Sequence, residues 1–182
     1  MTIANYIQAN KDNAIKEASL SKIPASITLA QGILESAAGN SRLAKEANNH
    51  FGIKCHSDWY GEHITASDDA PNECFRKYKT VLDSYKDHTN FLKKHARYSK
   101  LFDLGVTNYI GWARGLQNAG YATSNSYANT LIKIINDNQL YKYDNQVAFY
   151  KVEKYIEIAL IVFAIALLIY LGYRIRKNKK TS

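Results

Sequence analysis

The stretch LAQGILESAAGNS, residues 29–41, sets one acid, Glu35, into a run of small and aliphatic side chains. The apolar positions recur at helical spacing and predict a buried helix that starts near Pro24 and stops before Gly39. A carboxylate in such a helix either pairs with a cation, reaches water at a cleft or keeps its proton, because burying an unpaired charge is costly. The third case produces a general acid. The structural alternative is a helix-end acid paired with Arg42 or Lys45.

The flanking sequence continues this helical pattern, with one interruption. We expect further helices over residues 2–20, 41–47, 80–95, 108–119 and 126–138. In the helix over residues 80–95, Ser84 and Asp87 are candidates for a capping box. Between residues 48 and 78, alternating residues, aromatics and turn formers predict a small antiparallel hairpin. The fold class is therefore mainly α, a helical body with a small antiparallel β-hairpin lobe.

The C-terminal part has a different character. Residues 156–173, IEIALIVFAIALLIYLGY, contain one charge, Glu157, and would span about 27 Å as a helix, close to the thickness of a bilayer's hydrocarbon core. A core helix that is apolar on every face would need a larger protein around it. We therefore expect a C-terminal transmembrane helix at 156–173, preceded by a linker at 144–155 and followed by a basic tail at 174–182.

The charge distribution argues against a nucleic-acid partner and orients this expected helix. Residues 151–182 carry +5 of the formal net charge of +8, so the first 150 residues carry only +3. The positive-inside rule puts the basic C-terminus in the cytoplasm and the N-terminal domain on the periplasmic or cell-wall side. Residues 1–22 contain no secretory signal pattern, so the apolar segment would have to serve as both signal and anchor.

Six separated motifs resemble one family of hydrolases. AQGILESAAGNS, NNHFGIKC, WYGE, ECFRKY, SYKDHTNFL and GLQNAGYATSNSYANTLIKII occur in the order found in the N-acetylglucosaminidase domain of glycoside hydrolase family 73 and cover roughly residues 20–141. That family contains bacterial autolysins, flagellar peptidoglycan hydrolases and phage lysins. The resemblance implies a lysozyme-like α+β fold for residues 1–143, without metal or organic cofactor.

The resemblance also assigns site residues. The glutamate of the family's Glu-Ser pair is the catalytic acid, which corresponds to Glu35. The family takes a second carboxylate from the hairpin, where its usual Thr-x-Glu is absent here and ASDDAPNE, residues 66–73, stands instead. We favour Asp69, then Asp68, and a solvated acidic turn is the structural alternative. Tyr121 matches a tyrosine that lines the family's active site.

Several other aromatic and polar residues are weighed as site residues or as structural ones. Phe51, Trp59 and Trp112 are possible sugar platforms, with core packing as the alternative for each. Asn49 is expected at the loop that opens the cleft, as a substrate contact or as a brace of that loop. Tyr127 is expected to pack in the last helix of the domain. Asp87 and His88 are adjacent on a helix, where neighbouring side chains diverge, so we interpret them as structural.

Cys55 and Cys74 flank the predicted hairpin and are candidates for a disulfide outside the cytoplasm, which would stabilise the fold by roughly 3 kcal/mol. A zinc site built from Cys55, His56, His63 and Cys74 is the less favoured alternative, because the spacing fits no usual zinc pattern.

These observations predict a membrane-tethered peptidoglycan hydrolase that cleaves the bond after N-acetylglucosamine in the glycan strand. A muramidase or lytic transglycosylase is an alternative within the same fold. A non-catalytic, membrane-anchored wall-binding module is a second alternative, favoured by the missing Thr-x-Glu. The expected partners are the glycan strand and the membrane, and the sequence indicates no particular protein partner.

Overall fold

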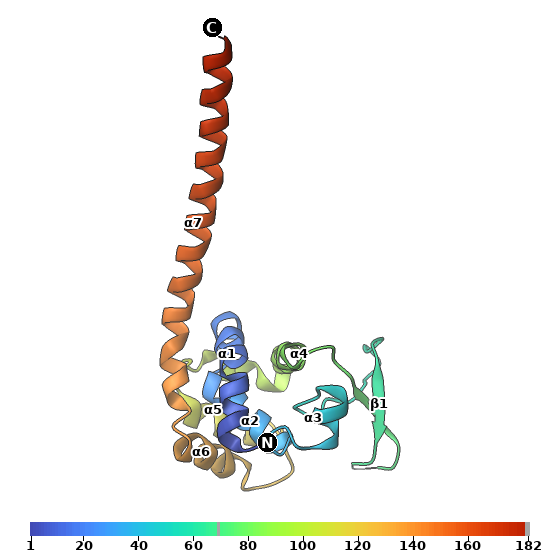
Figure 1. Ribbon diagram of the computed structural model, residues 1–182. Coiled ribbons are helices and arrows are strands. Elements are labelled where there is room, and N and C mark those ends of the chain that lie inside the picture. The colour runs from blue at the N-terminus through green and yellow to red at the C-terminus, as the bar shows by residue number, and fades with distance from the viewer. Residues whose placement is uncertain (69, 181–182) are drawn as a thin grey trace. The chain divides into compact units, whose positions relative to one another are not determined.

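The computed structural model describes residues 1–68 and 70–180, with side chains up to residue 170. The chain forms two compact units, Met1–Val147 and Ala148–Ser182, which are considered separately. The first unit contains the helical body and the hairpin lobe, and its elements follow the order expected from the sequence (Figure 1).

Helix α2 (Ala25–Glu35) is the centre of the helical body. It packs against α1 (Ile3–Ser21), α5 (Tyr109–Asn118) and α6 (Tyr127–Asp137), and every residue from Ala25 to Ile33 is buried. The stretch from Ala25 to Ile33 carries no charge, so a position surrounded on several sides removes its side chains from water at little cost. The predicted buried helix is confirmed, and Glu35 is its last residue.

Gly32 lets α1 approach α2 closely. A Cβ atom at this position would lie 2.5 Å from Tyr6 Oη and 3.1 Å from Tyr85 Oη. The two hydroxyls are hydrogen-bonded to each other at 3.1 Å, and Tyr6 Oη also bonds His50 Nδ1 at 2.8 Å. These buried rings have little freedom to retreat, so the position requires the smallest residue.

Replacing Gly32 by Ala is expected to lower the free energy of unfolding by about 1–2 kcal/mol. A Cβ only 2.5 Å from a fixed hydroxyl puts the overpacking cost in the upper part of its usual range, about 2–3 kcal/mol, of which alanine's helix propensity returns roughly 1 kcal/mol. Urea unfolding measures the difference. Gly105→Ala is the matched control, because a Cβ there meets nothing within 4 Å. Equal stability of the two variants would contradict the close packing of α1 on α2.

The hairpin lobe consists of β1 (His63–Ala66) and β2 (Glu73–Arg76), paired antiparallel with Thr65 opposite Cys74. Residues 53–55 run along the other edge of β2, where Lys54 pairs with Phe75. Cys55 N donates to Cys74 O at 2.9 Å. The short helix α3 (Arg42–Ala47) contacts β1 and connects the lobe to the helical body (Figure 1). The predicted small antiparallel hairpin is confirmed.

Helix α4 (Val81–Lys94) begins with a different cap from the predicted one. Thr80 and Asp83 form the capping box, and the Ser84 hydroxyl instead accepts from His50 N at 3.1 Å. The Ser84–Asp87 prediction was wrong because two polar pairs with the same spacing overlap here, and packing selects the earlier start. A 3₁₀ helix, η1 (Ala96–Asp103), follows and had not been predicted.

The segment expected as a linker is helical. Helix α7 (Tyr141–Lys180) is continuous through residues 144–155, and the first compact unit extends to Val147. Asp144, on the first turn of α7, is buried and accepts from Ser26 N at 2.8 Å and from Ser26 Oγ at 2.6 Å. The beginning of α2 is therefore capped by a carboxylate more than one hundred residues away in sequence.

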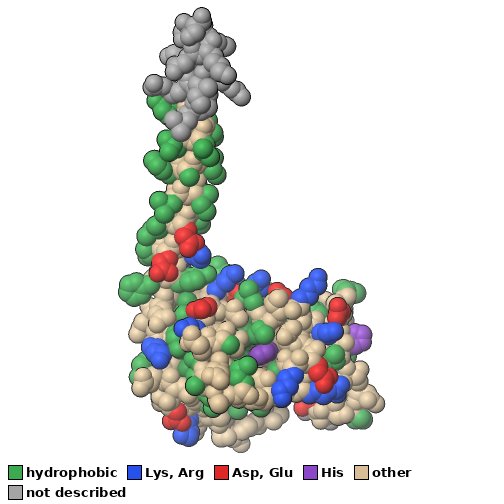
Figure 2. All heavy atoms as spheres, in the orientation of Figure 1, with side chains coloured by type: hydrophobic (Ala, Val, Ile, Leu, Met, Phe, Trp, Pro, Cys, Tyr) green, Lys and Arg blue, Asp and Glu red, His purple; other side chains and the backbone are tan. Residues whose placement is uncertain are grey.

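Within the part of the chain that the structure describes, no helix is long and apolar enough to qualify as a membrane span. The predicted span at 156–173 is thus not supported there. The side chains of its last three residues, and those of the basic tail at 174–182, lie outside the described residues. Figure 2 shows hydrophobic side chains along the described part of the second unit, beyond the charged groups near its start.

Candidate active site

Glu35 stands where α2 ends abruptly. Ser36 closes the helix, and the next three residues, Ala37, Ala38 and Gly39, all adopt left-handed backbone conformations with φ of 49°, 53° and 76°. Ala38 N donates to Ile33 O at 2.8 Å, and Ser36 Oγ accepts from Gly39 N at 2.7 Å. Two alanines in this region carry a conformational cost, and such strained turns are concentrated at functional sites. The turn directs the chain away and leaves Glu35 at a surface opening.

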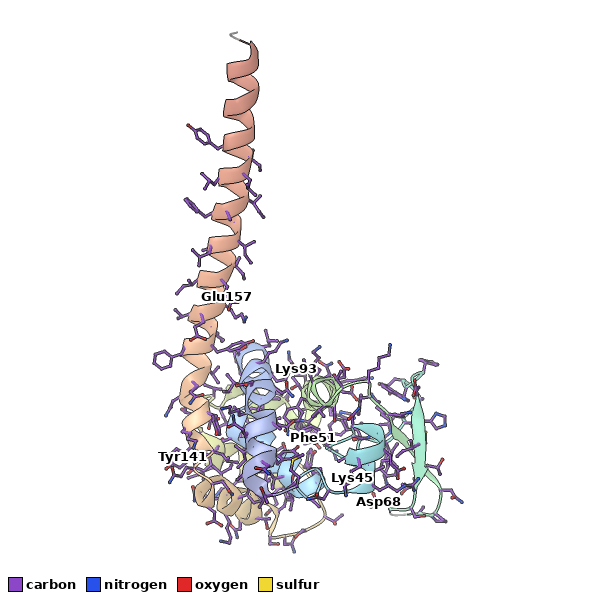
Figure 3. All side chains as sticks on the ribbon, in the orientation of Figure 1. Lys45, Phe51, Asp68, Lys93, Tyr141 and Glu157 are labelled. Atoms are coloured by element: carbon purple, nitrogen blue, oxygen red, sulfur yellow. A yellow bond between two sulfur atoms is a disulfide. The ribbon has the colours of Figure 1, made fainter. Side chains whose placement is uncertain are left out.

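A cleft of about 540 Å³ lies at this opening. The helical body contributes Glu35, Phe91 and Tyr121, and the loop after α3 contributes Phe51. The hairpin lobe contributes Lys54, Asp68 and Phe75. Phe51 and Asp68 are labelled in Figure 3. The volume falls in the range typical of small-molecule sites, and the lining mixes aromatic with charged side chains.

The surroundings of the Glu35 carboxyl raise its pKa. The residue is exposed to solvent because it opens on the cleft, yet surrounding protein atoms desolvate the carboxyl, and this desolvation raises its pKa above the ordinary value. A hydrogen bond from Tyr127 lowers the pKa, and the negative charge of Asp68 raises it further. Among the described residues Glu35 makes no ion pair, and Arg42 pairs with Glu46 at 2.9 Å instead. The alternative in which Glu35 is a helix-end acid paired with Arg42 or Lys45 is therefore wrong.

Tyr127 contacts the acid directly. Its Oη donates to Glu35 Oε1 at 3.0 Å, and Gln31 Nε2 donates to the same Oη at 3.0 Å. Tyr127 was expected only to pack in α6. The sequence offered no signal for this contact, because Tyr127 and Glu35 are 92 positions apart.

Tyr121 lies in the cleft as expected. Its ring stacks on that of Tyr127 with centroids 5.5 Å apart, and it also meets Phe91 and Tyr98 edge-on or tilted. Burial and the nearby Glu35 carboxyl raise the pKa of Tyr121 well above its ordinary value. The hydroxyl is therefore protonated at neutral pH and available as a hydrogen-bond donor.

Asp68 faces Glu35 from the hairpin lobe. Both residues line the cleft, and Asp68 Oδ2 lies 3.5 Å from Lys54 Nζ. Lys54 Nζ also contacts Glu73 Oε1 at 2.7 Å, so one lysine joins two lobe carboxylates. Lys54 was not among the predicted site residues. Asp69, the first choice for the second acid, lies outside the described residues.

The other predicted contacts divide between the cleft and its surroundings. Phe51 lines the cleft and stacks on His88 with centroids 4.1 Å apart. Trp59 does not line it. It borders a separate groove with Tyr78, and its ring packs against Arg76 at 4.9 Å.

Asn49 is buried, and its side chain forms hydrogen bonds to backbone atoms. It donates to Ile53 O and Arg76 O, both at 2.9 Å, and accepts from Ile53 N at 3.1 Å. Neither Trp59 nor Asn49 therefore lines the cleft, and Asn49 acts as the brace that was the alternative for it.

Asp87, His88 and Trp112 are structural. Asp87 pairs with Arg76 at 3.0 Å, whereas His88 is fully buried between the rings of Phe51 and Tyr121, and burial lowers its pKa to about 3. Trp112 is completely buried against Phe102, so it is no sugar platform. Asp87 and His88 thus diverge, as expected for neighbours on a helix.

Cys55 and Cys74 form the predicted disulfide, with their Cα atoms 5.3 Å apart. The bond joins the 53–55 segment to β2, and each cysteine neighbours a residue of the cleft, Lys54 and Phe75. With both sulfurs in this bond, the zinc alternative loses its two thiolate ligands.

Comparison with known proteins places this arrangement in a family. A family model described as glucosaminidase, mannosyl-glycoprotein endo-beta-N-acetylglucosaminidase, matches residues 11–140. The exo-glucosaminidase LytG of Bacillus subtilis (strain 168) is 39% identical over 134 residues, which are 65% of this chain and 45% of LytG. The peptidoglycan hydrolase FlgJ of Vibrio parahaemolyticus is 30% identical over 142 residues, 71% of this chain and 46% of FlgJ.

The chain thus spans less than half the length of these curated relatives. Among solved structures, the peptidoglycan hydrolase of Sphingomonas sp. A1 is similar with a TM-score of 0.66 and 30% identity, covering 80% of this chain and 95% of that one. The glycoside hydrolase domain of Salmonella typhimurium FlgJ has a TM-score of 0.66 and 27% identity, covering 88% of this chain and 98% of that domain. Since the family model covers well over half of the sequence, and the folds agree over the same region, the chain belongs to the glucosaminidase family.

Proposed function

We propose that the protein hydrolyses the glycan strand of peptidoglycan at the bond after N-acetylglucosamine. The observation that carries this proposal is a carboxyl with a raised pKa at the mouth of a sugar-sized cleft, facing a carboxylate of the hairpin lobe. Its support from relatives is the naming of LytG as an exo-glucosaminidase and of FlgJ as a peptidoglycan hydrolase.

In this mechanism Glu35 gives its proton to the glycosidic oxygen as the bond from that oxygen to the sugar's anomeric carbon breaks. The positive charge that develops on the sugar is stabilised by a carboxylate of the lobe. Tyr121 and Phe51 provide the aromatic faces against which sugar rings pack. Water then adds its hydroxyl to the anomeric carbon, and the remaining proton of that water reprotonates the Glu35 carboxylate.

The activity is expected to decline as pH rises through the raised pKa of Glu35. The acid works only while protonated, and desolvation shifts its loss of the proton to higher pH. The same raised pKa affects stability: the folded state is favoured below the unfolded pKa of the carboxyl, and this contribution to the free energy of unfolding is lost as pH rises through the folded pKa. Rates of fragment release from purified cell wall, measured against pH, check this. A rate that stays constant from acid to alkaline pH would contradict the acid role.

Asp68 is proposed as the second carboxylate, with Asp69 as the competing candidate. Replacing Asp68 by Asn is expected to lower kcat about tenfold or more and to shift the alkaline limb of the pH profile to lower pH. The shift follows because the negative charge of Asp68 raises the pKa of Glu35, and the variant lacks that charge. Asp69→Asn, measured in parallel, assigns the role to Asp69 if that variant alone loses activity.

The bond that is cut can be identified by mass spectrometry of the released fragments. A reducing N-acetylglucosamine end supports the proposal. A reducing muramic acid end would indicate a muramidase, and an anhydromuramic end a lytic transglycosylase, so either would overturn it. Binding to cell wall without loss of turbidity would reduce the protein to a wall-binding module.

We further propose that the second unit associates with a membrane, with the catalytic unit on the cell-wall side and the C-terminus in the cytoplasm. One support is the apolar sequence of residues 156–173. Another is that the large apolar side chains of residues 156–170 are exposed, with exposed fractions from 46% at Leu167 to 70% at Leu168. An exposed apolar surface of this extent marks a site of interaction. Retention in membranes after alkaline carbonate washing supports this proposal, and recovery in the soluble fraction would contradict it. Protease treatment of intact cells and spheroplasts tests the orientation.

A further inference from the structure

A short hydrogen-bond chain leads from the core of the helical body to the acid. Gln31 and Glu35 are one turn apart on α2 and therefore share a face. Tyr127, the first residue of α6, places its hydroxyl between them, 3.0 Å from Gln31 Nε2 and 3.0 Å from Glu35 Oε1. Gln31 is fully buried and Tyr127 is 4% exposed, so the chain is shielded from water.

The chemistry of the three groups gives this chain a direction. An amide nitrogen carries only donors, so the oxygen of Tyr127 accepts from Gln31. The single hydroxyl hydrogen of Tyr127 then points to Glu35 Oε1, which must accept it. An oxygen that accepts in this way is a poor place for the carboxyl's own proton, and Oε2 remains.

We propose that Gln31 and Tyr127 are positioning residues that keep the transferable proton of Glu35 on Oε2. The inference rests on the proposed function, since it concerns the acid of that reaction. During the reaction Tyr127 keeps its own hydrogen. The proton on Oε2 passes to the glycosidic oxygen as the carbon–oxygen bond breaks, and the resulting carboxylate continues to accept from Tyr127 through Oε1.

Two observations indicate that the chain is held in place. Tyr127 is 4% exposed and its ring stacks on Tyr121 with centroids 5.5 Å apart and an interplanar angle of 25°, contacts that restrain the ring. Gln31 Oε1 is buried with no hydrogen-bond partner among the described residues. An unbonded buried oxygen destabilises the fold, and an apolar side chain of the same shape would avoid that cost. The hydrogen bond that its amide nitrogen donates to Tyr127 accounts for the presence of Gln31 in α2.

Without this chain the acid has an unproductive alternative. A proton on Oε1 could be donated inward to the oxygen of Tyr127, where no substrate reaches it. Donation from Gln31 occupies that oxygen and disfavours the inward arrangement. Donation from Tyr127 also stabilises the carboxylate, which offsets part of the desolvation at Glu35.

The direction of the chain is tested by the sign of one pKa change. The Glu35 carboxyl of the full chain is titrated by ¹³C NMR, with the signal assigned through its loss in Glu35→Gln. In Tyr127→Phe the pKa of Glu35 is expected to rise, because the carboxylate loses a donor. A fall would mean that the protonated acid donates to Tyr127, and an unchanged pKa would mean that the contact does nothing. Either result overturns the proposal.

Gln31→Met tests the first member of the chain with little change in shape. It is expected to lower kcat on purified peptidoglycan about tenfold, a part of the ~10²–10⁴ that a positioned acid supplies, with KM unchanged. Unchanged kcat, or a rise in KM alone, would overturn the role of Gln31. Tyr85→Phe is the matched control, since it removes a buried tyrosine hydrogen bond that goes to Tyr6 and not to Glu35. If the wild-type protein cleaves no peptidoglycan, the proposed function fails, whereas the NMR titration still decides the direction of the chain.

Discussion

Replacing Glu35 by Gln is expected to reduce kcat on purified peptidoglycan by about 10²–10⁴-fold, the contribution of a positioned general acid. The amide has nearly the same shape and still accepts from Tyr127 through its oxygen, but it has no proton to give to the leaving oxygen. Release of soluble fragments and of new reducing ends measures the loss. KM is expected to change little, because the cleft walls remain intact.

The same variant is expected to be at least as stable as the wild type at neutral pH. The Glu35 carboxyl is desolvated, and the variant no longer has to ionise a carboxyl in that place. Glu46→Gln, which removes an exposed acid paired with Arg42, is the matched control and should retain activity. Substantial activity in Glu35→Gln, with the fold confirmed by circular dichroism, would remove Glu35 from the mechanism.

Replacing both Cys55 and Cys74 by Ser is expected to lower the free energy of unfolding by about 3 kcal/mol. The disulfide joins positions 19 residues apart, and in the chain-entropy model a loop of this length gives a stabilisation of that size. Activity is also expected to fall, because the bond holds the 53–55 segment on β2 and thereby sets the positions of Lys54 and Phe75 in the cleft. Urea unfolding and fragment release measure the two effects.

A reductant provides the control for this prediction. It should destabilise the wild type to the level of the double variant and leave the double variant unchanged. Thiol titration of the unreduced, denatured wild type should detect no free thiol. Two free thiols, or equal stability of wild type and variant, would contradict the predicted contribution of the bond.

The main features of the fold follow from local sequence patterns. Helix α2 was predicted from the spacing of its apolar residues, and the hairpin from alternation and turn formers between residues 48 and 78. The Cys55–Cys74 bond was anticipated because both cysteines flank that hairpin. The cap of α4 was misassigned because two polar pairs compete locally, and the choice between them depends on His50, whose backbone takes Ser84 as a partner.

The resemblance of six motifs led to Glu35 and Tyr121 and to the acids of the hairpin turn, but not to how these residues are arranged. Trp59 and Asn49 illustrate the limit. Both lie in family motifs, yet Trp59 borders a separate groove and Asn49 bonds the backbone, since a residue's position along a strand or loop does not say which side of the lobe its side chain occupies.

The sequence alone was enough to predict the helical body, the hairpin, a candidate disulfide and a candidate acid, Glu35, because each depends on spacing over a few turns or on a motif. Only the tertiary structure decided that Tyr127 and Gln31 hold Glu35, that Lys54 joins Asp68 to Glu73, and that Asp144 caps α2. These contacts join residues up to 118 positions apart. Hydrogen bonds between such residues form only after packing of the helices has brought them within 3 to 4 Å, and local periodicity contains no information about that packing.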